Sequence, residues 1–274
     1  MGLRIGEVSK LLDIPVETIR FYEAENILSP SRGADSNYRI YETWDIFFLM
    51  ACMKYRSLGI SVRDISKIIH AESLDFLLKK IDERQKSIHA EIQYNTLLCE
   101  KIEQYRLSLE TARINEGNFW FKMIPEHLYF IIIKSQGDQY DDFDMANSSL
   151  FTKWVRFFPF VESTEHISLK DIPRRDRMNR HQWSLTVEKK YAGILKIPVN
   201  DSVQSCPPQL CLCTIVDAGK KGDLSLKLLD PAMEYLQKNE YKVSGDIVGK
   251  ILVRIHEGAS FHRYIEIQIP VKKI

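Results

Sequence analysis

Arginine and aromatic side chains are concentrated in residues 18–41, whose sequence is TIRFYEAENILSPSRGADSNYRIY. In protein–DNA complexes, arginine binds phosphate oxygens and base edges, and hydroxyl-bearing side chains bind phosphates. The side chains placed to take part in such contacts are Thr18, Arg20, Phe21, Tyr22, Tyr38 and Arg39. Arg20 taken alone would be an ordinary surface arginine, so the interpretation depends on the elements that position these residues.

A helix followed by a loop and a strand must hold these side chains. The helix begins near Pro15, whose missing N–H suits a first turn, and its pattern ends at Asn26, a residue that tolerates left-handed backbone. Turn-forming residues fill 31–37, and residues 37–41 alternate in strand fashion. Helix, loop and basic strand tip predict a winged helix-turn-helix, whose wing lies against phosphates.

The motifs of this stretch resemble those of the MerR transcription regulators. They read TIRFYE at 18–23, NILSPSR at 26–32, NYRIY at 37–41 and YRSLGIS at 55–61. Two family glycines are replaced by Asn26 and Asn37, and asparagine keeps access to positive φ. The resemblance implies a DNA-binding domain over residues 1–76 and adds Arg56 to the DNA-contacting residues.

Residues 42–70 are expected to complete the core of this small domain with two further helices. The first of these helices carries an apolar set, Trp44, Ile46, Phe47, Leu49 and Met50. The second follows the turn at residues 59–61 and repeats its apolar residues at helical spacing.

Charge alone does not predict DNA binding. The chain has 274 residues, enough for two domains, and a formal net charge of +1. Its first 76 residues hold nine Lys and Arg against eleven Asp and Glu. A prediction of DNA binding therefore depends on the motif and on where its basic residues lie.

The sequence shows no signal for export or membrane insertion. The start, MGLRIGEV, lacks an apolar core of usable length, and apolar runs such as 129–133 are too short to cross a bilayer. Five cysteines suit reduced thiols. We expect a cytoplasmic protein without a membrane partner.

A long helix is predicted over residues 77–115, because no proline or glycine occurs from 77 to 113. A heptad frame places its dimerisation residues at two seam positions, Ile88, Asn95, Ile102 and Leu109 at one and Leu98 and Tyr105 at the other. A polar Asn95 inside a seam often sets the register. The alternative is a lone amphipathic helix on its own domain. The resemblance favours an antiparallel coiled-coil homodimer that addresses a palindromic promoter.

The hydrophobic period changes to two beyond residue 118, which predicts an α+β domain over 118–274. Strands are expected at 125–135, 181–191, 210–218, 247–255 and 262–271, and helices at 145–158 and 226–238. Their order suggests two tandem β-α-β-β units. The arrangement resembles the GyrI-like effector-binding domain of multidrug-sensing MerR regulators, most specifically in the closing strand, YIEIQIPV at 264–271.

The closing strand supplies an effector site. Alternation places His262, Tyr264, Glu266 and Gln268 on one face and isoleucines on the other, which should pack on the helices. Trp183 of the matching strand is expected opposite Tyr264, so that two rings flank Glu266. Such a site suits a flat lipophilic cation. Many relatives carry an acid in the preceding strand, and residues 248–252 have none.

Two other chemistries remain as alternatives. Cys206, Cys211 and Cys213 could form a metal–thiolate sensor, although their alternation with leucines favours buried strand thiols. A GyrI-like hydrolase is the other, but the sequence has no nucleophile elbow, HExxH or Gly-rich phosphate loop. We therefore expect no enzyme activity, metal or cofactor. The resemblance implies promoter DNA, RNA polymerase and a small effector as partners, with activation by DNA distortion.

Overall fold

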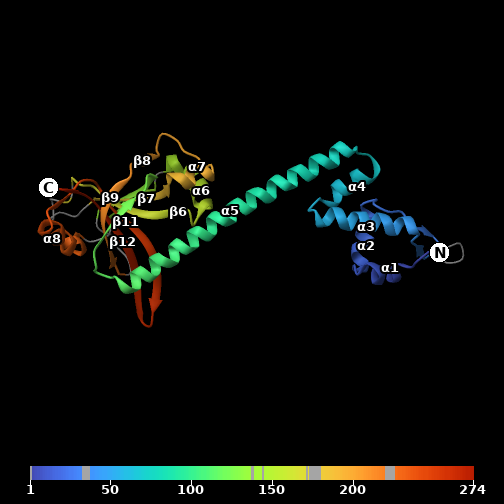
Figure 1. Ribbon diagram of the computed structural model, residues 1–274, viewed down its shortest axis with the longest axis horizontal. Helices are drawn as coiled ribbons and strands as arrows, with labels where there is room; N and C mark the ends of the chain where they lie inside the picture. The colour runs from blue at the N-terminus through green and yellow to red at the C-terminus, as the bar shows by residue number, and fades with distance from the viewer. Residues whose placement is uncertain are drawn as a thin grey trace. The chain divides into compact units, whose positions relative to one another are not determined.

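The computed structural model describes residues 2–32, 38–136, 139–143, 145–170, 172, 180–219 and 226–274. The chain divides into two compact units, residues 1–93 and 94–274 (Figure 1). The division falls within one helix, so the predicted boundaries at residues 76 and 115 stay a prediction.

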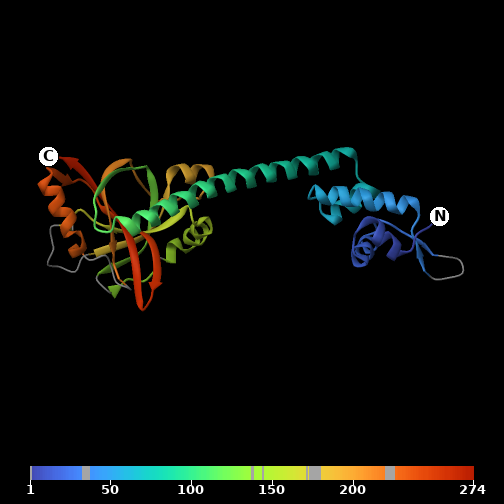
Figure 2. The same cartoon turned by 60° about the horizontal axis from the view of Figure 1, so that its bottom comes forward.

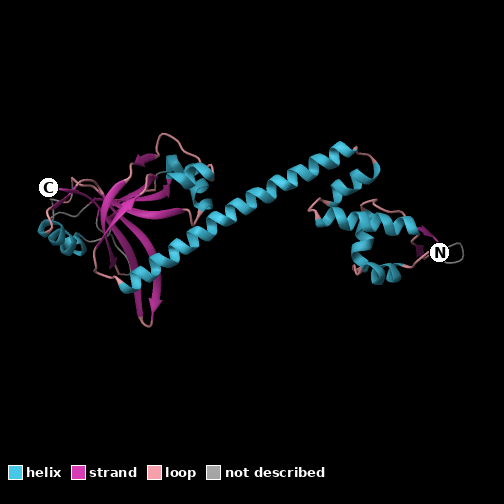
Figure 3. Ribbon diagram, viewed as in Figure 1, coloured by secondary structure: helices cyan, strands magenta, loops and turns pink. Residues whose placement is uncertain are grey.

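The first unit is helical with a small two-stranded wing (Figure 3). Its elements are α1 (Ile5–Leu12), α2 (Val16–Ala24), β1 (Ser31–Arg32), β2 (Arg39–Ile40), α3 (Thr43–Ser57), α4 (Val62–His70) and the start of α5 (Leu74–Ile114). Val8, Ile19 and Leu49 are fully buried in its core. Asn26 has a φ of 58°, which confirms the left-handed turn expected there. Asn37 lies outside the described residues.

The exposure of several apolar residues of α3 corrects the prediction that they complete the core. Leu49 is buried and Ile46 packs against the core, but Trp44 is 71% exposed, and Phe47 and Met50 are also exposed. Trp44 and Phe47 pack edge to face on each other, with ring centroids 5.7 Å apart. The physical reason is that the core of this unit covers only one stripe of α3.

The second unit is built on a ten-stranded sheet in which every pair described is antiparallel (Figures 1 and 3). The strand order is β3-β9-β12-β11-β6-β7-β4-β5, with β10 on β12 and β8 on β4. The strands are β3 (Trp120–Ile124), β4 (His127–Gln136), β5 (Gln139–Tyr140), β6 (Val161–Ile167), β7 (Arg180–Glu188), β8 (Gln204–Cys206), β9 (Gln209–Asp217), β10 (Tyr241–Val243), β11 (Ile247–Glu257) and β12 (Ser260–Lys273). The helices are α6 (Ser148–Trp154), α7 (Lys189–Ile194) and α8 (Asp230–Lys238), with 3-10 turns at Met145–Asn147, Val155–Phe157 and Leu226–Leu229.

Two tandem β-α-β-β units make up the centre of this sheet, as predicted. They are β4-α6-β6-β7 and β9-α8-β11-β12, and they meet where β6 pairs with β11. The sequence analysis missed β6 and β3, and it extended β7 too far. The strand ends at Glu188, after which residues 189–194 turn into α7.

The two faces of this sheet pack differently. Ile265, Ile267 and Ile269 of β12 pack with α8, which confirms the predicted isoleucine face. On the opposite face, the hydroxyl of Tyr105 in α5 donates to the carbonyl oxygen of Leu252 at 2.8 Å. Ala112 of α5 packs nearby with Leu252 and Ile215. The C-terminal part of α5 therefore lies across the sheet, as Figures 1 and 2 show.

Candidate DNA-binding face and effector pocket

Four cationic side chains surround one hollow on the first unit. Arg4 and Lys10 come from the first helix and its N-cap, Arg20 from α2 and Arg39 from the wing, and Tyr38 lies among them. We call these five residues the basic concavity. The guanidinium of Arg4 lies over the Tyr38 ring, 5.4 Å from its centroid. Glu7 also lines the hollow, and its carboxylate accepts from the backbone N–H of Arg4 at 2.7 Å. The arrangement presents exposed positive charge from three elements on one surface.

One half-buried carboxylate, that of Glu23, connects the wing to α2. Glu23 Oε2 lies 2.8 Å from Arg39 Nε, and its Oε1 accepts a short hydrogen bond from the Tyr41 hydroxyl. Burial and that bond hold the pKa of the Tyr41 phenol far above its usual value, so the hydroxyl stays a donor. Glu23 thus determines where the wing presents Arg39.

The predicted DNA-contacting residues fall into three groups. Arg20, Phe21, Tyr38 and Arg39 are exposed, and Thr18 is half-buried. Tyr22 is buried in the core beside Ile19, so its assignment to the DNA face is corrected to a core role. Its position follows from helical spacing, because residues 19 and 22 share one face of α2. Arg56 donates to the carbonyl oxygen of Ile60 at 3.1 Å, at the end of α3.

Helix α5 presents a row of exposed side chains, three of which are isoleucines. Ile88, Ile92, Asn95, Cys99 and Ile102 are all exposed, and they are spaced four and three residues apart. Spacing of this kind places them along one stripe of a helix. We call these five residues the α5 stripe.

Two of the predicted seam residues face their own chain. Leu98 packs against the cluster that contains Trp154, and Tyr105 bonds to Leu252. Leu109 is half-buried. Leu98 and Tyr105 therefore follow the alternative prediction, in which the helix packs on its own domain. The reason is that the sheet occupies the side of α5 on which these two residues lie.

A pocket on the α5 side of the sheet joins the two β-α-β-β units. It has a volume of about 100 Å³ and is lined by Lys122, Ile124, Pro125, His127, Glu162, Thr164, Thr186, Glu188, Val248, Lys250 and Gln268. We call it the central pocket. Its walls come from β3, β4, β6, β7, β11 and β12, so both repeats contribute to it.

Ion pairs dominate the wall of the central pocket. Glu162 Oε1 lies 2.9 Å from Lys250 Nζ and 2.8 Å from Lys101 Nζ of α5. Burial opposes the charge on Glu162, but the two lysines outweigh it and hold the pKa of that carboxyl below its usual value. Burial likewise opposes the charge on Lys250, but Glu162 keeps the pKa of its ammonium raised. Glu162 and Lys250 are therefore both charged near neutral pH.

Glu266 lies beside this pocket. It is buried, its Oε1 lies 3.3 Å from Lys122 Nζ, and it accepts from Gln268 Nε2 at 3.0 Å. His262 Nδ1 lies 2.7 Å from an Asp217 carboxylate oxygen, and the His262 ring stacks on Tyr264 with centroids 5.9 Å apart.

Two rings flanking Glu266 are not observed, which corrects that prediction. Trp183 on β7 and Tyr264 on β12 are separated by β6 and β11. Trp183 has the same alternation as Leu185 and Val187, which pack with α6, and its Nε1 donates to Ser135 Oγ at 3.3 Å. Tyr264 packs with Ala112 of α5 on the opposite face. The two rings therefore point to different sides of the sheet.

The strand cysteines are buried thiols. Cys211 and Cys213 point to one face of β9, and burial raises the pKa of the Cys211 thiol to about 12. Protonated thiols are poor metal ligands. Within the described part of the chain, no three His, Cys, Asp or Glu side chains are grouped to hold a metal ion.

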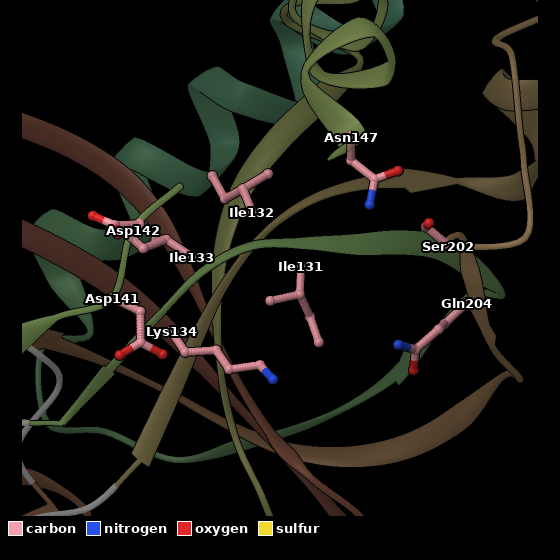
Figure 4. A pocket seen from close by; sticks show the side chains of 9 residues that line it. All are labelled: Ile131, Ile132, Ile133, Lys134, Asp141, Asp142, Asn147, Ser202 and Gln204. Carbon is pink, nitrogen blue, oxygen red and sulfur yellow. The ribbon is translucent and has the colours of Figure 1, made fainter. Parts of the chain in front are cut away.

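A second hollow lies at the β4 edge of the sheet (Figure 4). Its lining residues are Ile131, Ile132, Ile133, Lys134, Asp141, Asp142, Asn147, Ser202 and Gln204. Among these described residues, Ser202 is the one hydroxyl, and none is a histidine or a cysteine.

A buried histidine on the pocket side of β6 makes stability depend on pH. His166 stacks on Tyr129 with ring centroids 4.5 Å apart, and burial, aided by His127, lowers its pKa to about 4. Because the unfolded chain binds this proton more readily, we expect full stability above pH 6.5 and a loss of roughly 3 kcal/mol as the pH falls to 4. Urea unfolding of the wild type and His166→Gln across this range checks it. Parallel pH profiles for the two proteins would contradict the expectation.

Comparison with known proteins identifies the first unit. Residues 3–72 match the model of the MerR HTH family regulatory proteins. We call residues 3–72, the part of the chain that this model matches, the MerR-family domain. All five residues of the basic concavity lie within this matched part of the chain.

Curated relatives match stretches of the chain that differ in length. Heavy metal-dependent transcription regulator 2 of Rhizobium meliloti is 34% identical over 67 residues, which are 24% of this chain and 46% of that protein. Transcriptional regulator BrlR of Pseudomonas aeruginosa is 24% identical over 162 residues, 57% of this chain and 57% of its own. The chain spans about half the length of the curated relatives it matches.

Among solved structures, EcmrR in its cryo-EM complex with DNA aligns with 99% of this chain and 100% of that chain. The identity is 16% and the TM-score is 0.38, and a likeness at this level carries no argument about fold or function.

Sequence reasoning missed three residues of the MerR-family domain. Arg4 and Lys10 lie outside the motifs, and folding brings them beside Tyr38. Glu23 appeared in the sequence analysis only as the last residue of the motif TIRFYE, without a structural role. Its signal was an acid in a helix followed by an arginine and a tyrosine two positions apart in the predicted strand at residues 37–41.

No helix in the described parts of the chain combines the length and apolar character needed to cross a bilayer.

Proposed function

We propose that this protein is a dimeric transcription regulator that binds promoter DNA through its MerR-family domain and responds to a small effector. The observation that carries the proposal is the basic concavity, where Arg4, Lys10, Arg20 and Arg39 meet on one surface. Exposed cations on a helix and a wing can bind phosphates on both sides of a groove. The two curated relatives described above are transcription regulators, which supports the same function.

A second copy of the chain is the partner proposed for the α5 stripe. Its exposed isoleucines would be covered in an antiparallel coiled coil, and Asn95 inside the stripe would set the register. Two MerR-family domains in one dimer would then bind the two halves of a palindromic promoter.

The central pocket is the proposed effector site, and α5 is the proposed connection to DNA. The same helix contributes Lys101, which pairs with Glu162 of the pocket wall, and residues up to Gln93 to the first unit. An effector can shift the protein toward an activating form only if it binds that form better. That form would distort the promoter so that RNA polymerase can use it. A lipophilic cation is the effector class that the GyrI-like resemblance implies.

Arg20→Ala is expected to weaken DNA binding by about tenfold. The slope of log affinity against log salt concentration should fall by about the contribution of one phosphate contact. The side chain is exposed, and its contact with Glu17 at 3.3 Å is a surface ion pair, which contributes little to folding. Duplex sites selected from a random pool by the wild-type protein supply the target, and fluorescence anisotropy at several salt concentrations measures binding. Lys54→Ala, at an exposed lysine of α3 outside the basic concavity, is the matched control.

If the affinity and salt slope of Arg20→Ala equal those of Lys54→Ala, the basic concavity is not the DNA-binding face. If the selection yields no preferred duplex at all, the regulator proposal itself fails.

A further inference from the structure

We propose that the effector of the central pocket is a small organic anion, a carboxylate with a single ring, and not a lipophilic cation. The inference rests on the proposed function, because it names the ligand of the proposed effector site. Three independent properties of the pocket support it: its charge balance, the burial of its cations and the chemistry of its lining.

The charge balance favours an anion. Lys101 and Lys250 share a single carboxylate oxygen, Glu162 Oε1, at 2.8 and 2.9 Å. Two further ion pairs each have one member in the pocket lining and are one to one, Lys122 with Glu266 at 3.3 Å and Glu188 with Lys190 at 3.0 Å. The group formed by Glu162, Lys101 and Lys250 therefore carries one excess positive charge, and Lys250 is its lysine that lines the pocket.

Burial strengthens the attraction of this excess charge for an anion. The side chain of Lys101 is 5% exposed and that of Lys250 is 21% exposed, so water and salt screen them weakly. A charge removed from water attracts a counter-charge more strongly than a surface charge does, because the effective dielectric constant is lower. Lys101 and Lys250 now share one negative partner. A ligand carboxylate beside Lys250 would provide a second one.

The lining does not suit a lipophilic cation. Among the described residues that line the pocket there is no phenylalanine, tyrosine or tryptophan, whose ring faces attract such cations. The apolar part consists of Ile124, Pro125 and Val248, and hydroxyl groups come from Thr164 and Thr186. A volume of about 100 Å³ excludes bulky multi-ring compounds.

An anion bound here would also act on α5. Glu162 holds Lys101 of α5 and Lys250 of β11 with the same oxygen. When a ligand carboxylate takes Lys250, Glu162 is left to Lys101 alone. The ligand thereby changes an ion pair that fastens α5 to the sheet, which is the change that an effector must make to be reported to DNA.

Three ligands of the same shape and different charge test the proposal: benzoate, benzamide and benzylammonium. Calorimetry and thermal shift on the full-length protein are expected to show that benzoate binds about tenfold tighter than benzamide, and that benzylammonium binds more weakly than either. Lys250→Gln should reduce benzoate affinity to that of benzamide. Lys101→Gln should weaken benzoate as well, although its side chain does not line the pocket.

Glu162→Gln is expected to change benzoate affinity in the opposite direction, because it releases both lysines. Lys153→Gln, at an exposed lysine of α6, should change nothing. A general loss of folding cannot produce effects of opposite sign. Benzylammonium binding as tightly as benzoate, no binding of any probe, or the same direction of change in Lys250→Gln and Glu162→Gln would each overturn the proposal.

Failure of this inference is distinguishable from failure of the proposed function. DNA binding of the unliganded protein is measured separately. A protein that selects duplex sites and prefers benzylammonium remains a regulator with a cationic effector. A protein that prefers benzoate and selects no duplex site has the proposed ligand class without the proposed function.

Discussion

Replacing Ile92 and Ile102 together by aspartate is expected to yield monomers and to abolish binding to the selected duplex. The two side chains are 58% and 56% exposed in the single chain, although isoleucine is among the residues most often buried. A carboxylate in a coiled-coil seam must lose its water without gaining a partner, which opposes association. One MerR-family domain alone makes too few contacts for stable binding. Sedimentation equilibrium and anisotropy measure the two effects.

Leu98→Asp is the informative comparison for that double variant. Leu98 packs against the cluster around Trp154, so its replacement should destabilise the second unit and leave association as a secondary effect. An intact dimer in the Ile92→Asp, Ile102→Asp protein would show that the α5 stripe is not the subunit interface. Monomers from Leu98→Asp in a fully folded protein would return Leu98 to the seam.

Trp154→Ala is expected to lower the free energy of unfolding of the second unit by about 3–5 kcal/mol. The side chain is fully buried and meets Phe130 edge to face, with ring centroids 4.9 Å apart. Its Nε1 donates to the carbonyl oxygen of Pro198 at 2.8 Å, so truncation leaves both a cavity and an unpaired acceptor. Hydrogen exchange should rise in β4 and β7 and stay unchanged in α1 and α2.

The matched control is Trp44→Ala, because Trp44 of α3 is exposed. Its replacement should change stability by less than about 0.5 kcal/mol. Equal losses from both variants, or faster exchange in the first unit of Trp154→Ala, would contradict the assignment of Trp154 to a core that belongs to the second unit.

Much of the fold could be predicted from the sequence, because helices and strands leave local signatures. The absence of proline and glycine predicted α5 to within a few residues of its observed start at Leu74 and end at Ile114. Strand alternation predicted that Ile265, Ile267 and Ile269 share a face that packs on a helix. The strand β6 was missed, since VESTEHI has polar residues alone on one face, Glu162, Thr164 and His166, and both polar and apolar residues on the other.

The candidate DNA face was predicted in part. Arg20 and Arg39 were found because they belong to motifs with fixed spacing. Arg4 and Lys10 were not found, because only the packing of the first helix against the wing brings them close. Tyr22 was misplaced because a motif does not say which face of a helix is buried.

By itself, the sequence determined the order and type of most elements, the winged helix-turn-helix and the duplicated β-α-β-β arrangement. Spacing along the chain is sufficient for these, because the periods of 3.6 and 2 are local properties of the backbone. Only the tertiary structure decided that Leu98 faces the sheet, that Trp183 and Tyr264 lie on opposite faces, and that Glu162 holds two lysines at once. These outcomes depend on the rotation of α5 about its axis and on strand register, and both are set by partners far away in the chain.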